Sequence, residues 1–145
     1  MKKNIILGIT GSIAAYKAAD IANTLTKEGH SVHVIMTKAA MEFITPLTLQ
    51  TLTKNKVHTD QFAPYIPSEV EHISLAQKAD LFLVAPASAD FIAKAAAGIA
   101  DDMLTTTFMA CTCKKIVVPA MNTNMYYNPI LQDNIAKLRR FGIEV

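Results

Sequence analysis

LFLVA at residues 81–85 runs into PASAD at 86–90, and IVV at 116–118 runs into PAMNTNM at 119–125. Unbroken runs of Leu, Ile and Val are typical of strands that are buried on both faces, as in a parallel sheet covered by helices. Ligands of such sheets bind beyond the carboxyl ends of the strands, where the connecting loops carry the polar groups. The two polar turns are therefore candidate site loops.

The rest of the chain alternates between strands and helices. Strands are expected over residues 4–10, 31–37, 81–85 and 115–118, and helices between Ala14 and Gly29 and over 38–53 (restarting at Pro46), 90–97, 101–112 and 129–141. Residues 55–67 read as a surface loop marked by Pro64 and Pro67, after which a Ser68-x-x-Glu71 capping box starts a short helix that ends at Lys78. Residues 143–145 read as the start of a fifth strand.

This alternation determines the predicted fold class. Strand, helix and strand in succession imply right-handed crossovers between parallel strands. We therefore expect an α/β fold, a doubly wound, Rossmann-like and flavodoxin-like parallel sheet with helices on both faces. The length of 145 residues suits one domain that spans residues 1–145.

Composition excludes several classes of partner. The net charge is only +2, with no basic run, which argues against nucleic acid. No apolar stretch approaches the roughly 18 residues of a membrane span, and Gly8 interrupts the apolar run near Met1, which argues against a signal peptide. A cytoplasmic protein is expected. The hydrophobic content of 51% also favours packing between subunits.

Cys111 and Cys113 are the only cysteines of the chain. Cys111 lies in the last turn of the helix expected over 101–112 and Cys113 directly follows it, so the two are two positions apart and are not expected to bridge each other easily. Because no Cys or His companion stands at zinc spacing, no metal site is expected. Free thiols that act as small buried hydrophobic side chains, in a reducing compartment, are the simplest interpretation.

The segment GITGS at residues 8–12 joins the first strand to the first helix. Glycine allows the backbone to approach an anion closely, and free N–H groups at a helix start favour phosphate. The segment is neither G-x-G-x-x-G nor a P-loop, so an ordinary turn remains an alternative. The second strand ends at Thr37-Lys38 and not at the acidic residue that binds ribose in NAD folds. A hydroxyl can donate to a phosphate, which favours a mononucleotide.

His72 is the one histidine whose position suggests chemistry. Apolar residues follow it three, four and seven positions later, so it should lie on the inward face of its helix. A core histidine with one satisfied nitrogen and a catalytic base both fit this position. Ser88 and Asp90 likewise fit helix capping, and Asn122 fits a turn.

Taken together, four segments resemble a known family: GITGSIAAYK at 8–17, HISLA at 72–76, PASAD at 86–90 and PAMNxxM at 119–125. In this order and spacing they resemble the homo-oligomeric flavin-containing cysteine decarboxylases, most closely the bacterial branch that acts on phosphopantothenoylcysteine in coenzyme A biosynthesis. The resemblance covers essentially the whole chain. Its specific part is the PAMN run combined with the upstream histidine.

The resemblance implies an FMN site in which the phosphate of FMN lies at Gly11, Ser12 and Thr37. It also implies trimers, or dodecamers built from trimers, with each flavin at a subunit boundary. The cofactor-binding residues that it implies are Gly11, Ser12, Ile13, Thr37, Ser88, Ala89 and Asp90. His72 and Asn122 would be catalytic, and Asn122 and Met125 would bind the substrate. Relatives that modify peptides tend to carry Asn at the position of Asp90, so Asp90 favours the coenzyme A branch.

The implied reaction is the FMN-dependent decarboxylation of 4′-phosphopantothenoylcysteine to 4′-phosphopantetheine. Loss of CO₂ from an unactivated cysteine would leave a carbanion without a place for its charge. When the carbon that bears the thiol is oxidised to a thioaldehyde, with the flavin as electron acceptor, the thioaldehyde can accept this negative charge. His72 would act as the base and Asn122 would hold the substrate carboxylate.

Three alternatives remain open at this point. A peptidyl-cysteine decarboxylase would keep FMN and the histidine but bind a peptide tail. A non-catalytic flavin-binding regulatory subunit would need neither His72 nor Asn122, and a flavin prenyltransferase would have no reason to carry both. In the family that the chain resembles, the last step uses a cysteine on a flap C-terminal to residue 145, so we expect that flap to be missing from this chain.

Overall fold

The computed structural model describes residues 1–60, 62 and 71–145, with the backbone alone for 71–73. Its centre is a sheet of four parallel strands, β1 (Asn4–Ile9), β2 (Ser31–Met36), β3 (Leu81–Ala87) and β4 (Lys114–Pro119), in the order β2-β1-β3-β4. Glu144 forms a parallel bridge with Ile116 of β4, so the chain begins a fifth strand position next to β4. This is the flavodoxin-like order, and the expected fold class is confirmed.

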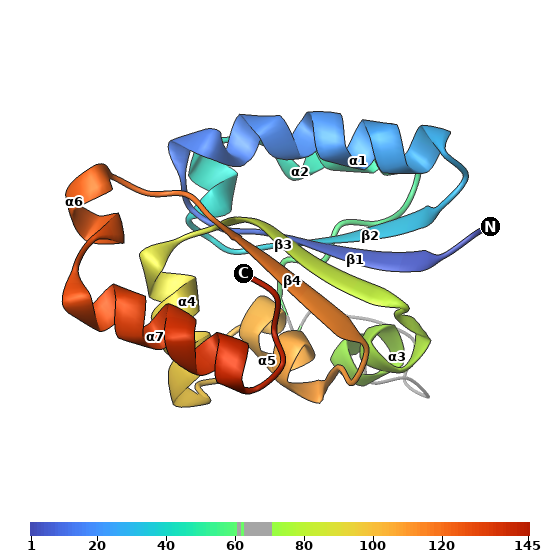
Figure 1. Cartoon of the computed structure of the whole chain (residues 1–145). Helices are drawn as coiled ribbons and strands as arrows, with labels where there is room; N and C mark the ends of the chain where they lie inside the picture. Colours follow the sequence, from blue (N-terminus) through green and yellow to red (C-terminus); the bar gives the residue numbers. More distant parts are fainter. Residues whose placement is uncertain (61, 63–70) are drawn as a thin grey trace.

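Helices cover both faces of the sheet, as Figure 1 shows. The helices α1 (Lys17–Lys27) and α2 (Pro46–Thr53) lie on one face, and α3 (Glu71–Lys78), α4 (Ala89–Ala97), α5 (Met103–Ala110) and α7 (Pro129–Arg140) lie on the other. Two 3₁₀ turns, Ile13–Tyr16 and Ala40–Glu42, precede α1 and α2. A short helix, α6 (Thr123–Tyr126), projects at the end of the sheet where β4 finishes.

Each face of the sheet has its own apolar core. On the α1 side, Leu7, Val34 and Ala18 are completely buried. On the other side, the ring of Phe108 meets those of Phe82 and Phe91 edge to face, with 5.2 Å between centroids in both pairs. Burial on both faces explains why the strands read as unbroken apolar runs.

The structure corrects the sequence-based bounds at three places. Pro86 and Ala87 belong to β3, so the polar turn begins at Ser88. The helix expected over 101–112 begins only at Met103, because Asp102 is its N-cap in a capping box with Thr105, and it ends at Ala110. The PAMN turn, finally, continues into α6, which the sequence analysis did not predict.

The irregular stretch after α2 also contributes to the sheet. His58 pairs with Ile35 at the outer edge of β2, and its backbone exchanges hydrogen bonds with Val34 and Met36. The predicted features at Pro64, Pro67 and Ser68 lie outside the described residues. In the part of the chain that the structure describes, none of the helices has the length and apolar character needed to span a bilayer.

Candidate functional site

Four loops meet at the edge of the sheet where the strands end. The chain leaves β1 towards the α1 face and leaves β3 towards the opposite face, so the loops after these adjacent strands part from one another (Figure 1). Such a topological switch point is where open α/β sheets bind ligands. The loops after β2 and β4 flank this point on either side.

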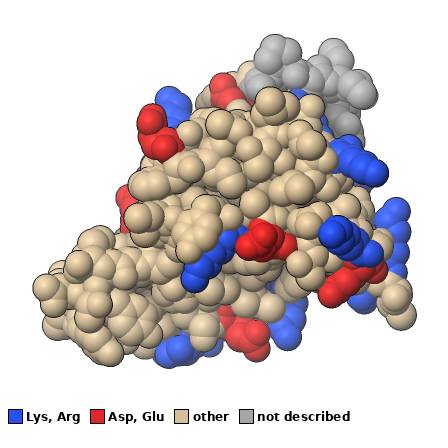
Figure 2. Space-filling view, turned by 90° about the horizontal axis from the view of Figure 1, so that it is seen from above, with Lys and Arg blue, Asp and Glu red and all other residues tan. Residues whose placement is uncertain are grey.

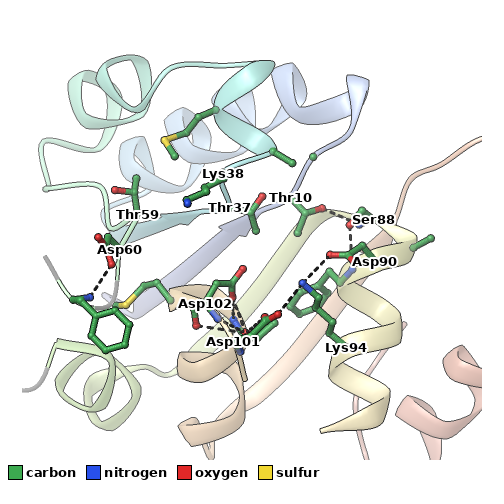
Figure 3. A pocket seen from close by; sticks show the side chains of 18 of the residues that line it. Thr10, Thr37, Lys38, Thr59, Asp60, Ser88, Asp90, Lys94, Asp101 and Asp102 are labelled. Carbon is green, nitrogen blue, oxygen red and sulfur yellow. Dashed lines mark hydrogen bonds and ion pairs between the residues drawn. The ribbon is translucent and has the colours of Figure 1, made fainter. Parts of the chain in front are cut away.

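Thr10 ties the two central loops together. Its hydroxyl donates to the carbonyl oxygen of Pro86 at 2.7 Å and accepts from the backbone N–H of Ser88 at 2.8 Å. The side chain is buried, with an exposed fraction of 1%. Thr10 therefore fixes the position of the Gly11 loop relative to the Ser88 loop (Figure 3).

Gly11 allows the β1 and β2 loops to approach each other. A Cβ atom on Gly11 would lie 2.4 Å from the Cβ of Ala39 and 3.3 Å from its carbonyl carbon. Real Cβ atoms essentially never approach another heavy atom so closely, so any side chain here would push the two loops apart. Gly11 thus brings its backbone against Ala39, two residues after Thr37, and Gly11 and Thr37 line the same cavity.

Three hydroxyl groups around this point share one arrangement. The hydroxyl oxygens of Ser12, Thr37 and Ser88 accept the backbone N–H of Ala14, Ala40 and Phe91, at 3.2, 3.1 and 3.1 Å. Because each oxygen accepts at the start of a helical turn, each O–H hydrogen can still donate to a ligand. The arrangement supplies donors for an anion and contains no acidic ribose-binding residue at the end of β2.

Two adjoining cavities open at this edge. The larger has a volume of about 940 Å³ and the smaller about 660 Å³, which are sizes usual for small-molecule sites. Gly11, Ser88, Ala89 and Met125 line both. Of the remaining predicted residues, Thr37 and Asp90 line the larger cavity, and Ser12, Ile13 and Asn122 line the smaller.

An ion-pair network shapes the wall of the larger cavity (Figure 3). The ammonium of Lys94 lies 3.1 Å from a carboxylate oxygen of Asp101 and 3.4 Å from one of Asp90. The hydrogen bond that Lys94 donates to Asp101 has the largest effect and raises the pKa of Lys94; burial opposes it, and the charge of Asp90 raises the pKa further. The network joins α4 to the start of α5, and the two carboxylates offset the positive charge of Lys94. Lys38 also lines this cavity and is exposed.

Asn122 is the N-cap of α6. Its side-chain oxygen accepts from the backbone N–H groups of Asn124 at 2.9 Å and Met125 at 3.4 Å. This fixes the orientation of the amide, so its NH₂ group is the part that can donate to a ligand in the smaller cavity. The capping interpretation and a ligand-binding role are therefore compatible.

Comparison with known proteins identifies the family. The sequence profile of the family described as Flavoprotein matches residues 1–145. The chain belongs to the flavoprotein family. It is 52% identical over 144 residues to a probable phosphopantothenoylcysteine decarboxylase of Streptococcus mutans, which covers 98% of this chain and 80% of that relative. It is 50% identical over 143 residues to the coenzyme A biosynthesis bifunctional protein CoaBC of Vibrio vulnificus, covering 99% of this chain but only 36% of that relative.

Solved structures agree with this flavoprotein assignment. The fold superimposes on the FMN-dependent cysteine decarboxylase SpaF with a TM-score of 0.92 and 31% identity, covering 98% of this chain and 82% of that one. It superimposes on a PPC decarboxylase mutant complexed with pantothenoylaminoethenethiol with a TM-score of 0.86 and 31% identity, covering 99% and 81%. The expected family is confirmed.

The structure of this flavoprotein brings together all predicted site residues except His72. His72 lies in the first turn of α3, and the position of its side chain is outside what the structure describes. The inward orientation of His72 stays a prediction. The helix α3 packs against α5, whose first residues line the larger cavity.

Sequence reasoning missed several residues around the two cavities of the flavoprotein. Thr10 had a usable signal, a hydroxyl residue that ends an apolar strand. Lys94 and Asp101 had none, because their pairing depends on how α4 and α5 pack. Among the described residues, no cluster of three or more His, Cys, Asp or Glu side chains could hold a metal ion.

Proposed function

We propose that this chain is an FMN-dependent decarboxylase that converts 4′-phosphopantothenoylcysteine to 4′-phosphopantetheine in coenzyme A biosynthesis. The observation that carries the proposal is the pair of cavities that share Gly11, Ser88, Ala89 and Met125. The two cavities together have the size and the donors for FMN, and the smaller one also contains Asn122. The names of the relatives above support the same substrate.

The residues present fit FMN. The free O–H hydrogens of Ser12 and Thr37, with the close backbone at Gly11, provide donors for its phosphate, and Lys38 adds a positive charge on the same side. Ile13, Ala89 and Asp90 would contact the rest of the cofactor at the start of the two helical turns. Ser88 would contribute its hydroxyl between them.

The protein's own residues would then position the substrate. FMN, when bound, supplies the two-electron oxidation that makes the carbon next to the departing carboxylate able to accept charge. The amide NH₂ of Asn122 would donate to that carboxylate and hold it in place, and Met125 would pack against the substrate at the junction of the cavities. His72 would take the proton that is lost when the thiol-bearing carbon is oxidised.

His72→Asn tests the catalytic assignment. The variant should retain FMN and lose decarboxylation by about 10²- to 10⁴-fold, because the role of His72 is proton transfer and not cofactor binding. Flavin absorbance of the purified protein, yellow for wild type and variant alike, provides the control. Normal turnover by the variant would exclude His72 as the catalytic base and favour the alternative, a histidine of the core.

The same assay separates the remaining alternatives. We expect turnover of phosphopantothenoylcysteine and little turnover of a peptide that ends in cysteine. Preference for the peptide would favour a peptidyl-cysteine decarboxylase, for which the likeness to the cysteine decarboxylase SpaF is the supporting observation. FMN binding without turnover of either would indicate a regulatory flavin-binding subunit.

We also propose that the chain acts as a homo-oligomer, either a trimer or a dodecamer built from trimers, in the cytoplasm. Large apolar side chains are exposed near the cavities: Ile13 is 80% exposed, Tyr127 70% and Ile130 73%. The projecting end that carries α6 shows little charge at its tip (Figure 2). Light scattering should give a multiple of the 15.8 kDa chain mass, and a monomer with flavin bound would contradict the proposal.

A further inference from the structure

Cys111 and Cys113 form a sulfur pair away from the cavities. They follow α5 and precede β4, and thus lie at the edge of the sheet opposite to the candidate site. Their Sγ atoms are 2.8 Å apart. Non-bonded carbon atoms are usually about 3.5–4.0 Å apart, and the two sulfurs of a disulfide are about 2.05 Å apart. The two cysteines are free thiols whose sulfur atoms are in contact, and the expectation that they do not easily bridge stays a prediction.

The local backbone explains this contact. Helix α5 ends at Ala110, and Cys111 adopts an extended conformation with φ −78° and ψ 134°. The chain then bends at Cys113, which directs both side chains to the same side. The Sγ of Cys111 also lies 3.8 Å from the carbonyl oxygen of Ala76 in α3. The pair is therefore positioned by the packing of α5 against α3.

The two thiols differ in access to solvent. Cys111 is 2% exposed and belongs to the apolar core, whereas Cys113 is half-buried. Lys114 beside it is exposed, and the charge of Lys115 favours a negative charge on Cys113. An incoming reagent can thus reach Cys113 first, and a negatively charged one would be attracted.

We propose that Cys111 and Cys113 are a reversible dithiol–disulfide site that reacts with small anionic disulfides such as oxidised glutathione. The thiolate of Cys113 attacks one sulfur of the reagent, the reagent's S–S bond breaks, and one glutathione thiol leaves. The sulfur of Cys111 then attacks that of Cys113 and releases the second glutathione. Two cysteine thiols are oxidised by two electrons, and the reagent is reduced to two thiols that take up the two protons.

The environment of Cys113 also sets the pH dependence of this reaction. Burial, with a hydrogen bond to Cys111, raises the pKa of the Cys113 thiol to about 12. Because only the thiolate attacks a disulfide, oxidation should be slow near neutral pH and about tenfold faster for each added pH unit below that pKa.

Intact-protein mass spectrometry of the flavin-loaded protein tests this site, and its result does not depend on the proposed enzymatic function. Incubation with oxidised glutathione should remove the mass of two hydrogens from the monomer, and dithiothreitol should restore it. Cys111→Ser should stop at one attached glutathione, and Cys113→Ser should react much more slowly. Flavin absorbance should not change, because the pair lies at the opposite edge of the sheet.

Several outcomes would overturn the proposal. One is a wild-type protein whose two thiols both stay reduced at alkaline pH. Another is a stable single glutathione adduct on the wild type, since Cys111 would then not reach Cys113. Disulfide-linked dimers in place of the intrachain product would also contradict it.

Discussion

Gly11→Ala should weaken FMN binding in addition to destabilising the fold. The new methyl group would lie 2.4 Å from the Cβ of Ala39, where contact distances of about 3.5–4.0 Å are normal. Either the Gly11 loop or the loop after β2 must therefore move by roughly 1–1.5 Å. Because the obstruction also includes backbone atoms of Ala39, side-chain rotation alone cannot relieve it.

The size of the effect follows from what the movement breaks. Overpacking of this kind costs about 1–3 kcal/mol of folding free energy. Separating Gly11 from Thr37 removes at least one hydrogen bond to the phosphate, and hydrogen bonds to charged groups contribute about 1.5–3 kcal/mol. The dissociation constant of FMN should rise by about 10- to 100-fold.

Fluorescence titration of FMN into the apoprotein, alongside urea unfolding without FMN, measures both effects. Gly8→Ala is the matched control, because its new Cβ would meet Leu104 Cδ1 at 2.6 Å, the movable end of a side chain within the core. It should reduce stability and leave FMN affinity almost unchanged. If Gly11→Ala bound FMN as tightly as wild type, the assignment of this loop to the phosphate would be refuted.

Three further predictions concern single side chains. Lys38→Met should weaken FMN binding about two- to fivefold and leave riboflavin binding unchanged, whereas Lys2→Met should alter neither; equal loss for both ligands would place the phosphate elsewhere. Asn122→Asp keeps the oxygen that caps α6 but replaces the NH₂ donor with a charge that repels the substrate carboxylate, so kcat/KM should fall at least about tenfold with normal flavin content, and unchanged kinetics would exclude the assigned contact. Burial lowers the pKa of His33 below 6.5, so the unfolded chain takes up the proton first and the free energy of unfolding should decrease as pH falls below about 6.5. Urea unfolding of His33→Gln should show a smaller decrease, and an identical pH profile would contradict this.

The fold was predictable because its signals are local. Each strand is an apolar run between polar turns, and Thr45, Ser88 and Asp102 cap the helices that follow them. Parallel strands with helical crossovers then allow few arrangements. The edge of the sheet that carries the site follows from this topology, so the sequence alone was enough to predict that the loops at Gly11 and Asn122 belong to the site.

What was missed depends on contacts between distant segments. The hydrogen bonds of Thr10 join residues 76 and 78 positions away. The ion pair of Lys94 with Asp101 needs the turn between α4 and α5 to place two side chains at one cavity. Helix capping and ligand binding use the same residue types. The sequence alone therefore could not show that the side-chain oxygen of Asn122 caps α6 while its NH₂ group can still bind a ligand.

Release of CO₂ from carboxyl-labelled phosphopantothenoylcysteine tests the central claim most directly. The protein loaded with FMN should release labelled CO₂ and the apoprotein should not, with His72→Asn as the matched flavin-containing control. The account would be contradicted if FMN-loaded wild-type protein bound the substrate but released labelled CO₂ no faster than the His72→Asn control.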